Sequence, residues 1–183
     1  MLKRDYEGQV CSIARALEVV GERWTLLVIR DVGLGRHRFD ELLGSLGIAS
    51  NVLTDRLSRL VDAGVLERVR YRERPERFEY HLTEKGLDLG TALVALMQWG
   101  DRYLSERPPQ IARRRSDRSP VSVRFLAKDG TVVAPGELEF VPGPGVKPAK
   151  TRGNSSQPDR PRPPPRATKS LHVPRSPLTD SNR

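Results

Sequence analysis

Apolar residues recur at every third or fourth position through most of the first hundred residues, with polar residues between them. This spacing is typical of helices that bury one face. Ser12, Ser50 and Thr83 stand near three of the expected helix starts, where a hydroxyl can accept a hydrogen bond from a free amide of the first turn. The pattern predicts five helices, over residues 11–20, 22–32, 38–46, 50–63 and 84–105.

Between the fourth and fifth helices the pattern changes to an alternation of apolar and polar residues, which is typical of a half-buried strand. Residues 65–71 and 78–82 are therefore predicted to be two strands, and the charged residues 72–77 are predicted to be the loop between them. A short helix, a tight turn at residues 47–49 and a longer helix match a helix-turn-helix. The element order predicts a mainly α protein with a small β-hairpin, on the winged helix-turn-helix plan.

The rest of the chain divides by composition and turn signals. The sequence Asp129-Gly130 is a strong hairpin signal between strand-like segments at residues 121–126 and 131–133, and residues 137–141 are also strand-like. The predicted parts are an N-terminal arm at 1–10, the winged helix-turn-helix domain at 11–107, a basic linker at 108–119, a β appendix at 120–141 and a tail at 142–183.

The formal net charge is +9, but most of it belongs to the tail. Residues 142–183 hold nine basic and two acidic residues, whereas the first 141 residues hold 23 basic and 21 acidic residues. Contacts with nucleic acid must therefore be argued from local placement rather than from total charge. Ten of the fifteen prolines also lie in the tail, so we expect it to be disordered. It could attract phosphates at low salt, act as a proline-rich ligand or serve as a solvated spacer.

Several classes of protein are disfavoured by what the sequence lacks. The single cysteine, Cys11, excludes an internal disulfide, and no cluster of ligands suggests a metal or other cofactor. No apolar run is long enough to span a bilayer and the start does not resemble a signal peptide, so we expect a cytoplasmic protein without a membrane partner. There is no glycine-rich phosphate loop, no His-Glu-x-x-His and no nucleophile with a base. An enzyme is not expected.

The helix predicted at residues 50–63 has a leucine-rich side and a polar side. Short hydrogen-bonding side chains such as Asn51, Thr54 and Ser58 are what a recognition helix presents to base edges. Asp55 would repel phosphates, so it either accepts from a cytosine amine or holds an arginine in place. The alternative interpretation is an ordinary amphipathic surface helix with its polar side in solvent.

Arginines decorate the predicted hairpin, and its tip could reach the sugar-phosphate backbone beside a groove. Acidic residues alternate with them, so some of these arginines are expected to be paired on the surface. Arg36 and Arg38, before the third helix, are further candidates for phosphate contact. The full set of predicted DNA-binding residues is Arg36, Arg38, Ser50, Asn51, Thr54, Asp55, Arg56, Ser58, Arg59, Arg70, Arg72, Arg74 and Arg77.

Several motifs in order over about 95 residues resemble the HxlR-type winged helix-turn-helix regulators. The matching stretches are CSIARAL at 11–17, GERWTLL at 21–27, RFDEL at 38–42, VLTDRL at 52–57, AGVLER at 63–68, EYHLTEKG at 79–86 and WG at 99–100. The resemblance implies a bacterial-type, dimeric regulator that binds double-stranded DNA. Arg56 lies in the Leu-x-x-Arg-Leu motif, where we expect it to pack or to contact phosphate rather than to read a base.

In that family the first and last helices form much of the dimer interface. The sequence agrees, because both helices carry more apolar surface than so small a core could hide, although they could simply pack on their own domain. Two-fold symmetry predicts an inverted-repeat operator with half-sites ~10 bp apart or a multiple of that. The predicted interface residues are Ile13, Leu17, Leu93, Leu96, Met97, Trp99 and Tyr103.

Cys11 opens the first predicted helix, where the free amides favour negative charge. Several members of the family resemble redox or electrophile sensors through a cysteine at this place, which makes Cys11 a candidate sensor. The alternative is a small buried core residue. A small-molecule effector between the dimerisation helices and the core is a second possible switch.

The main competing function is a protein-interaction module, since winged helices sometimes bind protein through the same faces. The low net charge of the predicted domain keeps this alternative open. The β appendix loosely resembles an extension of some family members, but it has no cysteine pair, so a metal-binding role is not expected there.

Overall fold

The computed structural model describes residue 6 and residues 11–146 of the 183-residue chain. The predicted arm at 1–10 and tail at 142–183 therefore lie almost wholly outside the described residues. The elements are α1 (Ser12–Val20), α2 (Thr25–Gly33), α3 (Phe39–Leu46), α4 (Ser50–Asp62), β1 (Leu66–Glu73), β2 (Glu76–Leu82), α5 (Glu84–Tyr103), β3 (Phe125–Leu126), β4 (Val132–Val133) and the short 3₁₀ turn η1 (Pro135–Glu137). The predicted fold class, five helices and a two-stranded hairpin on the winged helix-turn-helix plan, is confirmed.

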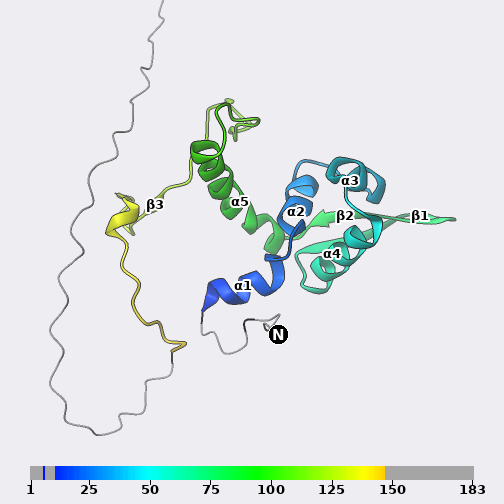
Figure 1. Cartoon of the computed structure of the whole chain (residues 1–183), viewed down its shortest axis with the longest axis horizontal. Coiled ribbons are helices and arrows are strands. Elements are labelled where there is room, and N and C mark those ends of the chain that lie inside the picture. The colour runs from blue at the N-terminus through cyan, green and yellow to red at the C-terminus, as the bar shows by residue number, and fades with distance from the viewer. Residues whose placement is uncertain (1–5, 7–10, 147–183) are drawn as a thin grey trace, which may run out of the picture. The chain divides into compact units, whose positions relative to one another are not determined.

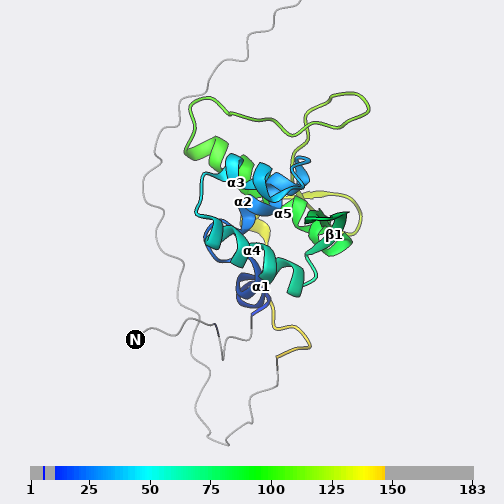
Figure 2. The same ribbon diagram turned by 90° about the vertical axis from the view of Figure 1, so that its right-hand side faces the viewer.

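The core lies where α2, α3 and α4 meet, and the three helices are neighbours in both views (Figure 1 and Figure 2). Leu53, Leu57 and Leu60 repeat at helical spacing along α4 and are fully buried, as the sequence predicted. Burial of such a leucine side chain stabilises the fold by roughly 1.5–3 kcal/mol. The leucine ridge therefore fixes which side of α4 remains in solvent.

Two features of the helix starts differ from the prediction: the position at which α2 begins, and the residues that cap α1 and α4. Trp24 has a left-handed backbone with φ 78°, so the turn after α1 extends through residues 22–24 and α2 begins only at Thr25. Cys11 and Ala49 are the N-cap residues of α1 and α4, one position before the predicted serines. Ser50 does not cap α4 with its hydroxyl; its carbonyl oxygen accepts a hydrogen bond from the Thr54 hydroxyl at 2.9 Å.

The hairpin formed by β1 and β2, which we call the wing, is longer than predicted. The strands are antiparallel and pair from Leu66 opposite Leu82 to Glu73 opposite Glu76. The predicted six-residue loop is reduced to a turn at residues 74–75, and Figure 1 shows the far half of the wing projecting beyond α3 and α4. The charged side chains of this part point into solvent and do not obstruct the strands. The backbone hydrogen bonds between the strands therefore continue to the tip.

The start of α5 is tied to the base of the wing. Thr83 caps the helix as predicted, because its Oγ1 accepts a hydrogen bond from the Gly86 amide at 3.2 Å. The same hydroxyl donates to the carbonyl oxygen of Gly64 at 2.7 Å. Gly86 is buried, and a Cβ atom there would lie 2.3 Å from the carbonyl oxygen of Val65. Only a glycine lets α5 approach the chain so closely at this point.

The β appendix contains less strand than predicted. Two-residue strands β3 and β4 pair around the expected turn, in which Gly130 has a φ of 85°. The predicted strand at 137–141 is absent: Glu137 ends η1, and its carboxylate accepts a hydrogen bond from the Ala134 amide at 2.8 Å. Within the described part of the chain, no helix is both long enough and apolar enough to cross a bilayer.

Candidate nucleic-acid interface

The polar side of α4 is exposed over its whole length. Asn51, Thr54 and Ser58, which we call the reading face, all lie in solvent opposite the buried leucine ridge. Among the described residues, no protein partner binds the side chains of Asn51 and Ser58. Their donors and acceptors are thus available to a ligand, as the chemistry of base edges requires.

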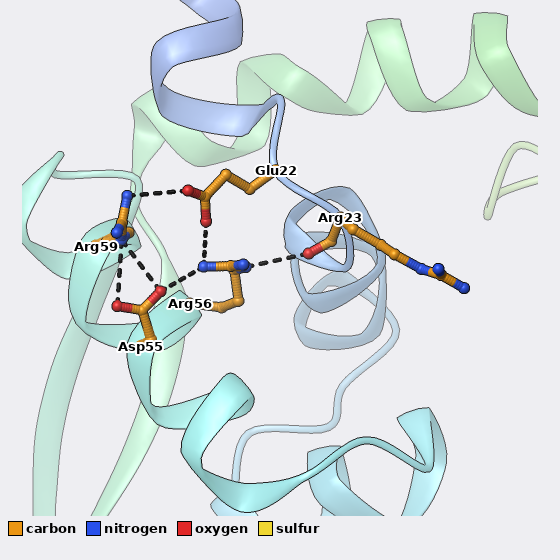
Figure 3. A network of polar contacts seen from close by, with 5 residues as sticks. All are labelled: Glu22, Arg23, Asp55, Arg56 and Arg59. Carbon is orange, nitrogen blue, oxygen red and sulfur yellow. Dashed lines mark hydrogen bonds and ion pairs between the residues drawn. The ribbon is translucent and has the colours of Figure 1, made fainter. Parts of the chain in front are cut away.

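Beside the reading face, two arginines and two carboxylates form one network (Figure 3). Arg59 lies 3.1 Å from Glu22 through Nη1 and 3.1 Å from Asp55 through Nε. The Nη1 atom of Arg56 pairs with both Glu22 and Asp55, and its Nε donates to the carbonyl oxygen of Arg23 at 3.1 Å. Asp55, Arg56 and Arg59 come from α4, whereas Glu22 and Arg23 come from the turn between α1 and α2.

The network separates the roles of the two arginines. The side chain of Arg56 is only 17% exposed, and it packs between α4 and the turn, whereas that of Arg59 is 59% exposed and faces solvent. Asp55 contacts both guanidinium groups. The sequence predicted that it either accepts from a cytosine amine or holds an arginine, and in this structure it holds arginines. Glu22 was not identified as a site residue from the sequence, because it lies far from α4 in the chain. The one sequence signal that could have indicated it is its place in the GERWTLL motif.

The start of α3 is joined to the wing. The Nε atom of Arg38 donates to Glu79 of β2 at 2.9 Å, and the guanidinium lies 4.8 Å from the ring centroid of Tyr71 on β1. The hydrogen bond to Glu79 is the main cause that raises the pKa of Arg38. The bond thus joins two opposite charges, and half of the Arg38 side chain remains in solvent.

A glutamate of α3 closes the first turn of that helix. The Oε2 atom of Glu41 accepts hydrogen bonds from the amides of Arg38 and His37, each at 3.0 Å. These bonds, that of Arg38 first, lower the pKa of Glu41. The negative charge fits the positive end of the helix dipole, so this pair of bonds fixes the entry to the helix-turn-helix.

Arg36, another predicted phosphate contact, approaches a buried acid. Its Nη1 atom is 3.9 Å from Oδ1 of Asp31, a fully buried carboxylate that the sequence reading missed. Arg30 binds the same oxygen atom through Nε at 2.8 Å. Arg36 remains 43% exposed on its side chain, which leaves it able to reach a phosphate group.

The wing presents its predicted arginines in different settings. Arg70 pairs with Glu76 at 3.3 Å, and Arg72 donates through Nε to the carbonyl oxygen of Arg74 at 3.1 Å. Arg74 and Arg77 are exposed, and neither side chain has an ion pair within the described part of the chain. Among the four predicted arginines of the wing, those whose side chains have no ion pair in the described part of the chain thus lie near the tip.

The proposed dimer residues are divided between solvent and core. Five of the seven form what we call the apolar face, and their exposed fractions are Ile13 68%, Leu17 37%, Leu96 53%, Trp99 53% and Tyr103 62%. Leu93 and Met97 are half-buried, and Leu93 packs against the core of its own domain. Cys11, the candidate sensor, is exposed at the start of α1.

Comparison with known proteins places this geometry in a family. Residues 19–108 match the family model described as HxlR-like helix-turn-helix. An uncharacterised HTH-type transcriptional regulator of Mycobacterium tuberculosis is 44% identical over 149 residues, which are 80% of this chain and 93% of the relative. The chain belongs to the HxlR-like helix-turn-helix family.

Solved structures of candidate transcription factors have the same fold as this HxlR-like protein. PA1607 has a TM-score of 0.66 at 36% identity and covers 73% of this chain and 96% of its own. PA1374 from Pseudomonas aeruginosa has a TM-score of 0.57 at 41% identity, and covers 75% of this chain and 96% of its own. A match of 149 residues is longer than the segment from α1 to α5, so the mycobacterial relative shares more than the winged helix-turn-helix. The HxlR-like chain is accordingly a DNA-binding transcriptional regulator of the helix-turn-helix type.

Proposed function

We propose that this regulator recognises a specific DNA sequence as a homodimer, that its operator is an inverted repeat, and that it acts in the cytoplasm as a repressor. The observation that carries the proposal is the exposed reading face of α4, held in place by the buried leucine ridge. Arg74 and Arg77 at the wing tip, and Arg36 and Arg38 before and at the start of α3, are the candidate phosphate contacts. Base contacts specify the sequence and phosphate contacts set the register.

The homodimer is supported by the apolar face of α1 and α5. Exposed aromatic and aliphatic side chains gathered on two helices are typical of a protein–protein interface. In a two-fold dimer the same face serves both subunits, and the two α4 helices read two half-sites in inverted orientation.

A random pool of DNA duplexes tests the proposal. Full-length protein should enrich one inverted repeat, and the variant Asn51→Ala/Thr54→Ala/Ser58→Ala should bind that repeat at least about tenfold more weakly, because each lost base contact is worth roughly 1–3 kcal/mol. Thr91→Ala, an exposed position on α5 outside the proposed contacts, is the control. Unchanged preference in the triple variant would exclude recognition through α4. No preferred duplex for the wild-type protein would favour a protein-interaction module instead.

We further propose that Cys11 makes the regulator responsive to oxidants or electrophiles. The thiol is exposed and begins α1, the helix that carries part of the apolar face, so oxidation or alkylation there would alter the dimer. Diamide or methylglyoxal should weaken operator binding by the wild-type protein and leave Cys11→Ser unaffected. Equal responses of the two proteins would exclude the thiol and leave a small-molecule effector as the alternative switch.

A further inference from the structure

Glu22 is the one acid of the Arg56–Arg59 network that does not belong to α4. It lies in the turn after α1, where its carbonyl oxygen accepts a hydrogen bond from the Thr25 amide at 3.1 Å. Gly21 before it donates its amide to the Leu17 carbonyl oxygen at 2.8 Å. The backbone at Glu22 is therefore fixed by the end of one helix and the beginning of the next.

The two oxygens of Glu22 are divided between two arginines. Oε1 lies 3.1 Å from Nη1 of Arg59, and Oε2 pairs with Nη1 of Arg56. Figure 3 shows the carboxylate between both guanidinium groups. Arg59 follows directly after Ser58 of the reading face, so Glu22 acts on the cation that lies closest in sequence to the proposed base contacts.

The charges of the network balance: Glu22 and Asp55 carry two negative charges against the two positive charges of the arginines. Without the charge of Glu22, one positive charge would be unbalanced beside the reading face. The mostly exposed Arg59 would then be held by Asp55 alone, through Nε, and its Nη1 atom could turn toward a phosphate group. Phosphate attraction is independent of sequence. An added phosphate contact therefore strengthens binding to unrelated DNA, on which base contacts do not fix the register of α4, more than it strengthens binding to the operator.

We propose that Glu22 is a specificity-determining residue. By neutralising and holding Arg59 it suppresses binding to unrelated DNA, so that affinity depends on the reading face. The proposal rests on the proposed recognition of DNA by α4. Glu22 acts through the arginines and is a positioning residue rather than a contact to DNA.

The competing explanation is a purely structural tie between the α1–α2 turn and α4. The two explanations differ in what they predict for the ratio of operator affinity to affinity for unrelated DNA. A structural tie affects the melting temperature and weakens both affinities together. A specificity residue changes the ratio itself, and its effect requires the guanidinium group on which it acts.

The experiment measures the affinity of full-length protein for the selected operator and for an unrelated duplex of equal length, at several salt concentrations. Glu22→Gln keeps the shape and removes the charge. We expect it to bind unrelated DNA about fivefold more tightly and to steepen the logarithmic salt dependence by about 0.9, the value for one added phosphate contact. Operator affinity should change less than twofold, so the ratio of operator affinity to affinity for unrelated DNA should fall at least about 2.5-fold. Glu22→Asp, which keeps the charge, should recover most of the ratio.

Two further variants isolate the mechanism. Asp62→Asn removes one negative charge from the exposed end of α4, at a residue without an ion pair among those described, and should change the ratio less than twofold. In an Arg59→Ala background, Glu22→Gln should no longer change the ratio. The inference is overturned by an unchanged ratio in Glu22→Gln, by an equal change in Asp62→Asn, or by a full effect without Arg59. Wild-type protein that prefers no duplex would instead remove the proposed function, and this inference with it.

Discussion

The imidazole rings of His37 and His81 are stacked, with their centroids 4.3 Å apart and their planes inclined by 27°. His37 lies just before α3 and His81 lies on β2, so the stack joins the helix-turn-helix to the wing. The carbonyl oxygen of His37 also accepts a hydrogen bond from the Tyr80 amide at 2.8 Å. These two contacts add to the hydrogen bond between Arg38 and Glu79 in joining the start of α3 to the wing.

Loss of the stack should destabilise the domain measurably. We expect His81→Ala to lower the free energy of unfolding by about 1 kcal/mol, the usual worth of an aromatic pair, and His81→Phe to restore most of it. Urea titration followed by circular dichroism measures both values. If the phenylalanine and alanine variants were equally unstable, stacking would not be the contribution of His81.

The apolar face should hold the dimer together. Leu96→Asp places a carboxylate on this face, where burial against a partner would strip its water, so we expect the dissociation constant of the dimer to rise more than about tenfold. Sedimentation velocity measures it. Leu34→Asp is a matched control, because Leu34 at the end of α2 is 54% exposed and Leu96 is 53% exposed. A variant at Leu96 that dimerises like this control would place the interface elsewhere.

The stability contributed by Glu41 should depend on pH in a defined direction. Its pKa is lowered in the folded state by the hydrogen bonds from Arg38 and His37, so it stabilises the fold above the unfolded value of about 4.3. This contribution is lost as pH falls through the lowered pKa.

The comparison of Glu41→Gln with wild type tests this sign. The variant should be less stable at neutral pH, and the difference between the two proteins should shrink toward zero in acid. Thermal melts between pH 7 and pH 3 measure the difference, with Asp40→Asn in the same helical turn as control. A difference that grew in acid would contradict the assignment.

Gln98 should hold the β appendix against α5. Its side chain donates to the Val121 carbonyl oxygen at 2.8 Å and accepts from the Val123 amide at 3.0 Å. In Gln98→Ala we expect the Val123 amide to exchange with solvent faster, because its acceptor is gone. Gln98→Glu keeps an acceptor for that amide and should retain the protection. Hydrogen exchange followed by NMR measures the effect, and unchanged exchange in Gln98→Ala would show that other contacts suffice.

The parts of the fold that depend on periodic burial could be predicted from the sequence. Leu53, Leu57 and Leu60 identify the inner side of α4 without ambiguity, and Thr83 identifies the start of α5 by its hydroxyl. The errors occurred where backbone conformation overrides the pattern. Nothing in the apolar spacing reveals the left-handed Trp24, and a charged stretch such as that near the wing tip can form a strand as easily as a loop.

Contacts between distant segments were the other limit. The exposed positions of Asn51 and Ser58 follow from helical spacing alone. The pairing of Glu22 with Arg56 and Arg59, or of Arg38 with Glu79, requires the chain to fold back on itself over tens of residues. Charge complementarity offers many such pairs in a chain that is 30% charged, and only the fold selects among them.

Gly86 lies between the wing and the part of α5 that carries the apolar face, so its size bears on how the proposed dimer meets DNA. The helix α5 leaves the base of the wing at this residue and then carries most of the apolar face. It is some 30 Å long. At Gly86 the helix lies so close to Val65 that there is room for a hydrogen atom but not for a Cβ atom. A methyl group there would tilt α5, and the far end of the helix would move by several ångströms. In the proposed dimer such a swing would change the centre-to-centre distance between the two half-sites that the α4 helices could reach. On this proposal the spacing of the operator depends partly on Gly86, a residue outside both the proposed DNA contacts and the apolar face.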